Sequence, residues 1–507
     1  MLPSRGLTTL CRNVLRSKVR LGVFSSRRSL LTLAIESSCD DTAVAIVSKQ
    51  PSGAAKIHFN EKITTDSTAY QGIHPIRALE SHQENLAKLI QKALSHLPPA
   101  SASESQPEIS IDKIVALPDG VRQKPDFISA TRGPGMRANL FTGLDTAKGL
   151  SVAWQIPFMG VHHMQAHLLT PRLVYATALP DGSQSLSDAM KPEHPSFPFI
   201  SILASGGHTL LVTSSSLTSH KVLATATDTA VGESLDKAAR LILPSSFLEK
   251  AKTTMYGKLL EEFAFPDGPE DYEDYTAPAT RGEELARGKV VTEAGWSLTV
   301  PFYQTRELAF SFASLPTAIK DILAGKGEWW GDCAEITEDE RRQLARESMR
   351  VCFEHLASRT IIALEEFCTP TPRPPPKYRV SRTTRAKMKP KPNPAHLPIK
   401  TLVVSGGVAA NSFLMKVLRS SLDARGFRHV EIVAPPPALC TDNAAMIGWA
   451  GIEMFEAGWR SELSARALRK WALGLEQVPG DLEGKVDDEG SMGLLGVGGW
   501  DHVNSSG

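Results

Sequence analysis

Two histidines four residues apart are the first candidates for chemistry in this chain of 507 residues. His163 and His167 lie in the segment GVHHMQAH, residues 160–167. On a helix, residues four apart share one face, so both imidazoles can reach one metal ion. A zinc peptidase would place a glutamate between them as its general base. The residues between them here are Met, Gln and Ala, which cannot take a proton from water and therefore argue against a peptidase.

Three polar turns that follow apolar runs are candidates for contact with a nucleotide. The first turn, residues 37–41, ends in Asp40 and Asp41, and the other two are Ser-Gly-Gly turns at 205–207 and 405–407. Glycine-rich turns after strands expose backbone N–H groups and let a phosphate approach closely. One such turn is weak evidence. Two of them, together with an acidic hairpin turn, are typical of a nucleotide site enclosed by turns from two opposite sides.

Alternating apolar runs and polar hinges predict the strands and helices that would hold these turns. Residues 30–49 and 197–213 each read as two strands joined by a tight turn, and residues 399–418 read as a strand that runs into a helix. Helical spacing of apolar residues predicts helices over 76–97 and 341–367. Because similar units recur in both halves of the chain, the sequence predicts a duplicated α/β fold.

The composition is that of a soluble globular protein, with 42% hydrophobic residues, 22% charged residues and a net charge of +1. The length is sufficient for two or more domain-sized cores. The six cysteines form no C-x-x-C pair, which favours a reducing compartment. No apolar run reaches the roughly 18 residues of a membrane span, so no membrane partner is expected.

The start of the chain and one internal segment have distinct compositions. The first 35 residues contain no acid and seven basic residues, which predicts a mitochondrial presequence over 1–29, with a basic tail as the alternative. Residues 369–400 hold nine prolines, nine Lys or Arg and no acid, and cannot fold alone. The predicted division is a first lobe over 30–170, a second lobe over 171–451 with inserts near 178–197, 264–296 and 369–400, and a C-terminal helix and tail over 452–507.

Seven motifs occur in order between residues 36 and 451 and together resemble one family. They are ESSCDDTAVAIV, TRGPGMRANLFTG, GVHHMQAH, SGGHT, AVGESLDKAAR, SGGVAANSFL and CTDNAAMIGWAG. The set is similar to the universal tRNA N6-adenosine threonylcarbamoyltransferases, formerly described as O-sialoglycoprotein endopeptidases. Thr229, where bacterial relatives usually have a second Asp, resembles the mitochondrial branch. The resemblance implies an α/β fold of the actin-like or Hsp70-like (ASKHA) type, with two duplicated lobes.

The same resemblance implies an activity and a metal site. The activity is transfer of threonylcarbamoyl from threonylcarbamoyl-AMP to N6 of adenosine 37 in tRNAs that read ANN codons, forming N6-threonylcarbamoyladenosine and releasing AMP. In this family the Asp of C-T-D-N completes the histidine pair, so the implied ligands are His163, His167 and Asp442. Two imidazoles and one carboxylate leave open positions, as a catalytic metal needs. One divalent ion per subunit is implied, and the sequence does not decide between zinc and iron.

Motif positions also imply a nucleotide site. A carboxylate is a natural partner for the ribose diol, which is the role implied for Asp236, and an ion pair with Lys237 or Arg240 is the structural alternative. Asn411 is expected at the adenine end. The family's Y-P-G-G-P is reduced here to MYGKLLE, which leaves the contacts of that segment open. The full implied set is Leu203, Ala204, Ser205, Gly206, Gly207, Asp236, Gly257, Glu261 and Asn411.

For several polar residues a functional role and a structural role both remain open. Asp40 and Asp41 are candidates for a partner that supports the metal site without binding the ion, or for a base that accepts a proton from the adenine amine, but Asp also favours turns for local reasons. His82 and His208 match family positions, and a structural role is equally compatible with each.

Two alternatives to the transferase remain open at this point. An actin-like small-molecule kinase or ATPase would share the fold, but it would not need the H-x-x-x-H and C-T-D-N set. A non-enzymatic RNA-binding subunit would bind tRNA without a metal or a nucleotide. For the transferase, the expected partners are tRNA and a separate synthase that supplies threonylcarbamoyl-AMP. The mitochondrial resemblance further implies a homodimer located in the matrix.

Overall fold

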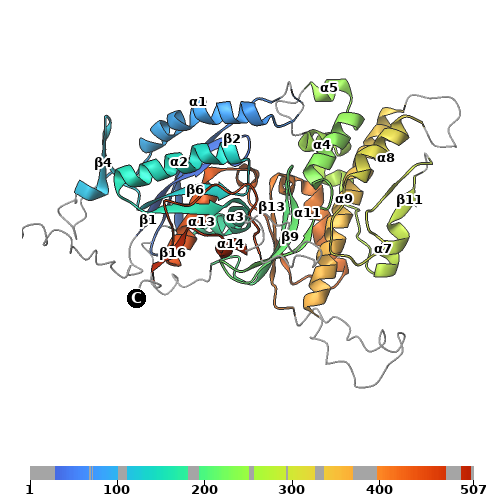
Figure 1. Ribbon diagram of the computed structural model, residues 1–507. Coiled ribbons are helices and arrows are strands. Elements are labelled where there is room, and N and C mark those ends of the chain that lie inside the picture. Colours follow the sequence, from blue (N-terminus) through green and yellow to red (C-terminus); the bar gives the residue numbers. More distant parts are fainter. Residues whose placement is uncertain are drawn as a thin grey trace, which may run out of the picture.

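The computed structural model describes residues 29–67, 70, 72–100, 111–180, 193–249, 256–292, 295–325, 336–368, 397–474 and 493–503. Nearly all of the predicted presequence and most of the basic insert at 369–400 lie outside these residues, as do parts of the other predicted inserts and of the tail. Figure 1 shows two lobes side by side, each with its own sheet.

The first lobe contains a seven-stranded sheet in the order β16-β15-β7-β6-β1-β2-β3. The apolar side chains of β1 alternate between its faces. Leu31, Leu33 and Ile35 pack against α1 (Pro75–Leu94) and α2 (Arg137–Trp154). The opposite face packs against α3 (His163–Ala178) and α13 (Ala444–Glu456). The strands are β1 Leu30–Glu36, β2 Asp41–Lys49, β3 Ala55–Thr64, β6 Phe127–Gly133, β7 Phe158–His162, β15 Trp459–Ser461 and β16 Trp500–His502.

The second lobe contains a five-stranded sheet in the order β10-β9-β8-β13-β14. In both sheets the first strand of the unit pairs antiparallel with the second, the second pairs antiparallel with the third, and the first also pairs parallel with the next strand of the sheet. This repeated topology confirms the predicted duplicated α/β fold. The strands are β8 Phe199–Ala204, β9 Thr209–Ser214, β10 His220–Thr225, β13 Thr401–Ser405 and β14 Glu431–Val433.

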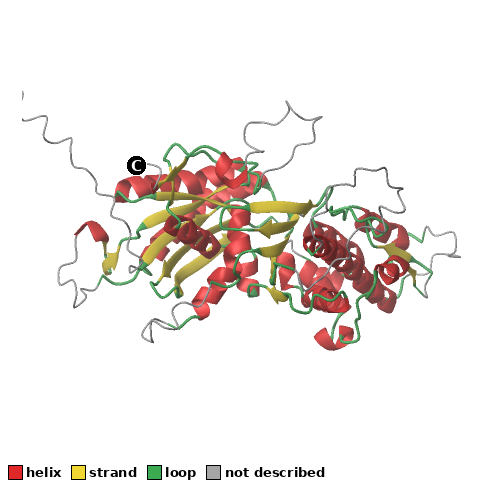
Figure 2. Cartoon of the chain, turned by 90° about the horizontal axis from the view of Figure 1, so that it is seen from below, coloured by secondary structure: helices red, strands yellow, loops and turns green. Residues whose placement is uncertain are grey.

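Helices cover the second sheet on the side away from the first lobe (Figure 2). The longest, α9, spans Glu338–Phe367 and confirms the helix predicted over 341–367, just as α1 confirms the one predicted over 76–97. The side chains of Thr337 and Glu340 form a capping box that fixes where α9 begins. The other helices of this layer are α4 Val231–Ile242, α6 Gly257–Ala264, α8 Ser314–Leu323 and α11 Ser412–Ala424.

Helix α13 connects the end of the second lobe to the first lobe. It packs on β1, β2 and α3, and the predicted lobe boundary at residue 451 falls inside it. Its residues 444–455 are all buried and mostly apolar, which is typical of a helix between two layers, and its one buried acid, Glu453, pairs with Arg172 at 2.8 Å. After α13, the described part of the predicted C-terminal region contains β15, β16 and the short helix α14 (Gly493–Gly496).

The remaining helices and strands of the described residues are short. Part of the predicted insert at 264–296 is integrated in the second lobe, because Tyr272 and Trp296 are buried in its core. Among the described helices, none is both long enough and apolar enough to cross a bilayer. These elements are η2 Ile111–Lys113, β4 Ile114–Leu117, β5 Gly120–Gln123, α5 Ser245–Leu248, η3 Gly268–Tyr272, α7 Arg281–Arg287, β11 Lys289–Val291, β12 Ser297–Thr299, η5 Gly407–Ala410 and α12 Pro437–Cys440.

Candidate metal and nucleotide site

The paired histidines lie in the first turns of α3. Strand β7 ends at His162, and the Nδ1 atom of His162 caps the helix by accepting hydrogen bonds from the backbone N–H groups of Met164 and Gln165. His163 and His167 project from one face of the helix, as their spacing predicts, with ring centres 4.8 Å apart. Both side chains are buried.

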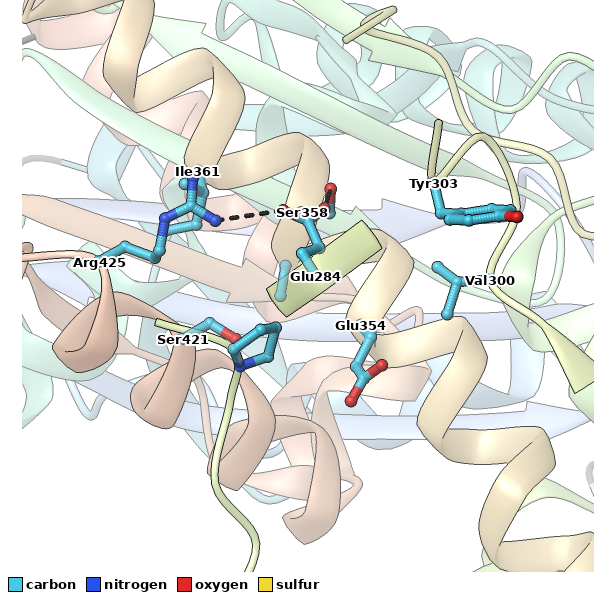
Figure 3. Close-up of a pocket in the computed structure, with 10 residues that line it drawn as sticks. Glu284, Val300, Tyr303, Glu354, Ser358, Ile361, Ser421 and Arg425 are labelled. Atoms are coloured by element: carbon cyan, nitrogen blue, oxygen red, sulfur yellow. Dashed lines mark hydrogen bonds and ion pairs between the residues drawn. The ribbon is translucent and has the colours of Figure 1, made fainter. Parts of the chain in front are cut away.

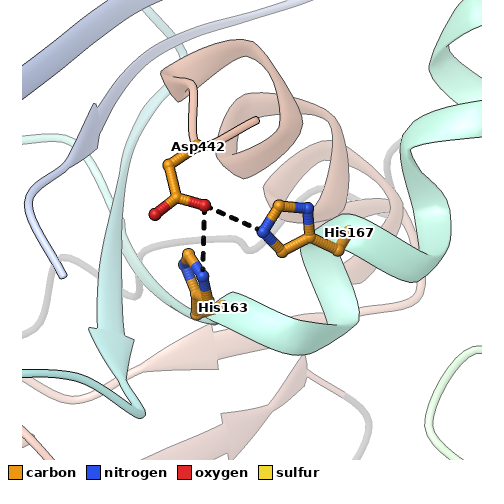
Figure 4. Close-up of side chains that lie close together, drawn as sticks. All are labelled: His163, His167 and Asp442. Carbon is orange, nitrogen blue, oxygen red and sulfur yellow. Dashed lines mark hydrogen bonds and ion pairs between the residues drawn. The ribbon is translucent and has the colours of Figure 1, made fainter. Parts of the chain in front are cut away.

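Asp442 comes to these histidines from the other end of the chain. It lies in the short connection between α12 and α13, where the side-chain Oδ1 of Asn443 caps α13 by accepting a hydrogen bond of 3.0 Å from the N–H of Met446. The Oδ1 atom of Asp442 lies 3.0 Å from Nε2 of His167 and 3.5 Å from Nε2 of His163 (Figure 4). The structure therefore brings together the three side chains that the resemblance implied as a metal site.

These three side chains fit a divalent ion in both donor chemistry and spacing. Their potential ligand atoms all lie within 4.8 Å of one another. A tetrahedral ion with bonds of about 2.1 Å holds its ligand atoms roughly 3.4 Å apart, so the widest pair would need to close by about 1.4 Å at most. Two imidazoles and one carboxylate also leave coordination positions for a water molecule or a substrate.

The electrostatics of the cluster favour a cation. Burial would lower the pKa of His163, but the negative charges of Asp442 and Glu36 outweigh burial and raise this pKa to about 9. Burial would raise the pKa of Asp442, whereas His163 and His167 hold it well below its usual range. A group of side chains that favours positive charge on an imidazole also favours a metal cation in the same place.

The structure places a further acid, Glu36, beside the metal-site histidines, and the sequence analysis did not single this residue out. It is the last residue of β1, and its side chain is fully buried. Its Oε1 atom accepts a hydrogen bond of 2.6 Å from the N–H of Ser38, and its Oε2 atom accepts one from the hydroxyl of Thr131. The Nδ1 atom of His163 lies 3.3 Å from Oε2. The sequence signals were an acid that closes the apolar run LLTLAIE and its place as the first residue of the motif ESSCDDTAVAIV.

The acidic turn lies close to Asp442 across the two lobes. Asp40 is in the turn and Asp41 is the first residue of β2, and burial together with the charge of Asp41 raises the pKa of Asp40. The ammonium of Lys62, on β3, donates to the Asp41 carboxylate at 2.6 Å and to the backbone oxygen of Asp442 at 3.2 Å. Lys62 thus links the first lobe to the loop that carries Asp442, a role for which the sequence offered no signal.

The predicted phosphate-binding turn connects β8 to β9. Its glycines, Gly206 and Gly207, are exposed, and a Cβ on either one would meet no atom within 4 Å beyond the adjacent residues. A ligand can therefore approach this backbone closely. The start of α4 lies against the same turn, because the N–H of Gly232 donates to the carbonyl oxygen of Ser205 at 3.2 Å. The buried residues beneath the turn are Leu203 and Ala204.

The second Ser-Gly-Gly turn, 405–407, joins the metal cluster to the phosphate-binding turn. The hydroxyl of Ser405 donates to the carbonyl oxygen of His167 at 3.0 Å. Gly406 has a φ of 91°, and a Cβ there would overlap the carbonyl oxygen of Ala204. Only glycine tolerates both the conformation and the contact. The histidines and the two glycine turns therefore meet in one place between the lobes.

Asp236 and Gly257 are neighbours in the second lobe. The Oδ1 atom of Asp236 accepts hydrogen bonds from the N–H groups of Tyr256 at 2.7 Å and Gly257 at 2.9 Å. Burial raises the pKa of Asp236 to about 6, in spite of these two donors. Of the two alternative ion-pair partners, Lys237 pairs instead with Glu233 at 2.6 Å, whereas the positive charge of Arg240 does act on Asp236 and opposes the rise of its pKa.

Glu261 and Asn411 both hold the start of α11. The Oε1 atom of Glu261 accepts a hydrogen bond of 2.7 Å from the N–H of Ser412. The Oδ1 atom of Asn411 accepts one of 3.0 Å from the N–H of Leu414, so Asn411 is the N-cap of this helix. Each residue therefore has a structural task beside the nucleotide contact that the resemblance implies.

The two other histidines that match family positions lie in different environments. His82, on α1, is buried and bridges the hydroxyl of Thr42 at 2.7 Å and the carbonyl oxygen of Cys39 at 3.0 Å, so it supports the acidic turn. His208 is exposed in the β8–β9 turn, within range of the charges of His163 and Asp442. His208 therefore lies close to the metal site, whereas His82 supports the acidic turn.

A separate pocket in the second lobe has internally paired charges. It lies beside α7, α9 and α11 (Figure 3). Arg425 donates to the carboxylate of Glu284 at 3.1 Å, and the hydroxyl of Ser358 donates to the same carboxylate. Since these groups satisfy one another, they need no ligand to account for them.

Comparison with known proteins identifies relatives along most of the chain. A family model described as tRNA N6-adenosine threonylcarbamoyltransferase matches residues 57–449. The mitochondrial tRNA N6-adenosine threonylcarbamoyltransferase of Schizosaccharomyces pombe is 32% identical over 468 residues, which cover 89% of this chain and 88% of that protein. The tRNA N6-adenosine threonylcarbamoyltransferase of a Chelativorans species is 29% identical over 452 residues, covering 88% and 96%.

Solved structures with detectable similarity are more distant. HypF of T. kodakarensis is 12% identical with a TM-score of 0.36, and the match covers 83% of this chain and 47% of HypF, so the chain spans about half of that protein. YeaZ of Pseudomonas aeruginosa is 14% identical with a TM-score of 0.20, covering 38% and 66%. These TM-scores are too low to support an argument, so the assignment of an actin-like fold rests on the family model and on the repeated sheet topology.

Proposed function

This chain belongs to the tRNA N6-adenosine threonylcarbamoyltransferase family, and from that premise we propose that it modifies adenosine 37 of mitochondrial tRNAs that read ANN codons. The donor would be threonylcarbamoyl-AMP, and the products would be N6-threonylcarbamoyladenosine and AMP. The observation that carries the proposal is the convergence of His163, His167 and Asp442, from opposite ends of the folded chain, beside two glycine-rich turns.

The metal part of the proposal assigns one divalent ion per subunit to His163, His167 and Asp442. This donor set suits zinc or iron. When bound, the ion would supply a Lewis acid and a template for the carbamoyl-phosphate group. The coordination positions left free by three protein ligands are what such a role requires.

The nucleotide part of the donor would be held by groups of the second lobe. The open backbone at Gly206 and Gly207 suits a phosphate. Asp236 suits the ribose hydroxyls, and its orientation is already set by the two amides that bind its Oδ1 atom. Asn411 and Glu261, at the start of α11, would line the nucleoside.

The transfer step needs a positioned amine and a proton acceptor. N6 of adenosine attacks the carbamoyl carbon, the bond from that carbon to the phosphate oxygen breaks, and AMP leaves with the electron pair. The proton lost by N6 must pass to a base. Asp40 is the base we propose, because its raised pKa suits proton acceptance and because the turn that carries it lies close to Asp442.

The cellular setting follows from the same family. We propose that a separate synthase supplies threonylcarbamoyl-AMP and that the enzyme acts as a homodimer in the mitochondrial matrix. The acid-free basic start of the chain and the mitochondrial name of the S. pombe relative support the location.

Mass spectrometry of tRNA nucleosides tests the proposed activity. The purified chain is incubated with threonylcarbamoyl-AMP, zinc or iron, and unmodified mitochondrial tRNA that carries adenosine 37. We expect N6-threonylcarbamoyladenosine with the wild type and little with Asp442→Asn. A wild-type reaction that leaves adenosine 37 unmodified with either metal would reject the proposal, and phosphorylation of a small molecule from ATP would favour the kinase alternative.

A further inference from the structure

Glu36 is a buried acid that the reaction described above does not use. Its side chain is completely inaccessible to solvent at the end of β1. Burying a carboxylate is costly unless hydrogen bonds and an opposite charge compensate it. The partners of Glu36 therefore indicate what the acid does.

The Oε2 atom of Glu36 faces one of the metal-site histidines. It lies 3.3 Å from Nδ1 of His163, while Nε2 of the same ring lies 3.5 Å from Asp442. The hydroxyl oxygen of Ser38 lies 3.2 Å from the same Nδ1 atom and can either donate or accept, so it does not select a tautomer. The carboxylate of Glu36 can only accept, so it favours a proton on Nδ1 and leaves the free lone pair on Nε2. That lone pair is the one directed toward the position of the metal.

The Oε1 atom of the same carboxylate holds the acidic turn. It accepts the N–H of Ser38 at 2.6 Å. The carbonyl oxygen of the following residue, Cys39, is bound by Asn139 of α2 at 2.5 Å and by His82 of α1 at 3.0 Å. Glu36 thus orients both the histidine and the turn that carries Asp40.

A dication would balance the charge of the two carboxylates nearest the histidines. Two carboxylates, Glu36 and Asp442, flank two imidazoles that must be neutral to bind a metal. A divalent ion brings this set to zero net charge, which removes the cost of an uncompensated buried acid.

We propose that Glu36 is the positioning residue of this site, which sets the tautomer of His163 for metal binding and holds the neighbouring turn in register with it. The inference rests on the proposed function for the presence of a metal. The proposal adds a residue that orients a metal ligand without contacting the ion. The same carboxylate would position both His163 and the turn that carries Asp40.

Glu36→Gln gives a specific expectation because glutamine has the same shape. Its amide oxygen would keep the hydrogen bond from Ser38, so its NH₂ group would face His163. An NH₂ donor favours an unprotonated Nδ1 and therefore a proton on Nε2, where the metal should bind. Removing such an outer partner typically weakens metal binding by about 10–100-fold, and we expect this range for zinc.

The test measures zinc affinity of the purified full chain by competition with a chromophoric chelator. Thr131→Val is the matched control, because it removes another hydrogen bond to Oε2 and leaves the carboxylate facing His163. We expect Thr131→Val to change zinc affinity less than about threefold. The visible spectrum of the cobalt-substituted protein should change in Glu36→Gln and stay the same in Thr131→Val.

A double variant separates positioning from general support of the fold. In a His163→Ala background, Glu36→Gln should have almost no further effect on zinc affinity, because the ring that it orients is gone. If Glu36→Gln does not fold, Glu36→Asp, which keeps the charge and shortens the reach, should also weaken zinc binding. Wild-type zinc affinity in the folded Glu36 variant, or an equal loss in Thr131→Val, would overturn this inference alone. A wild type that binds no zinc or cobalt would overturn the metal site as well.

Discussion

The half-buried carboxyl of Asp236 leads to a quantitative prediction about adenosine binding. Burial raises its pKa to about 6. Only the ionised carboxylate can accept hydrogen bonds from both ribose hydroxyls, so the binding-competent fraction of the protein follows ionisation. A group with a pKa of about 6 is roughly 9% ionised at pH 5 and about 91% ionised at pH 7. Affinity for adenosine should therefore rise about tenfold between these two pH values.

Folding and binding should respond to this group in opposite directions. Because the folded pKa of Asp236 exceeds the value of 3.8 for an ordinary Asp, its contribution to the stability of the free protein is complete below that value and is lost as the pH rises through about 6. Adenosine selects the ionised form, so its binding strengthens over the same interval.

Titration calorimetry of the metal-free protein with adenosine measures the effect. Adenosine is preferred to AMP because a phosphate group also titrates near pH 6. Asp236→Asn keeps the size of the side chain and removes its ionisation, so its affinity should be low and nearly independent of pH. The reasoning is refuted if the wild type binds adenosine equally at pH 5 and pH 7, or if the tenfold change persists in Asp236→Asn.

Substitutions at two further residues test neighbouring parts of the site. Asp442→Asn keeps the size of the ligand and removes its charge. It should weaken zinc binding more than about 100-fold, since loss of an outer partner alone costs about 10–100-fold. One tightly bound zinc per chain of this variant in elemental analysis would contradict the ligand assignment. Glu261→Ala should lower the free energy of unfolding by about 1 kcal/mol, because the N-terminus of α11 loses a side-chain acceptor, whereas Glu261→Gln should keep most of it. Urea denaturation curves that superimpose for the wild type, Glu261→Ala and Glu261→Gln would exclude this capping role.

Local spacing was sufficient to predict the elements and the first two metal ligands. The i,i+4 spacing of His163 and His167 requires only that the segment be helical, and the structure confirms that both rings share one face. The strands at 30–49 and the helices α1 and α9 were likewise predictable, because apolar runs joined by a polar turn and period-3.6 patterns depend on neighbours in sequence. The position of Asp442 required the resemblance to a family, since no local pattern connects it to the histidines.

The placement of α13 was beyond local pattern. Its residues AAMIGWAGIEMF are apolar apart from Glu453, so the sequence predicts burial without indicating which sheet the helix covers. The choice of the first sheet follows from packing, because small residues let strands and helix approach: Gly448 lies against Val47 and Ala34, and Gly451 against Ser129.

Only the tertiary structure decided which groups surround the histidines. Asp442 is 275 residues from His167, Glu36 is 127 residues from His163, and Lys62 is 380 residues from the backbone oxygen that it binds. An acid at the end of a strand reads in sequence as the start of a solvated turn. It becomes a buried partner of His163 only because β6 and α3 close over it, and the cost of burying its charge then requires compensation that the linear sequence does not reveal.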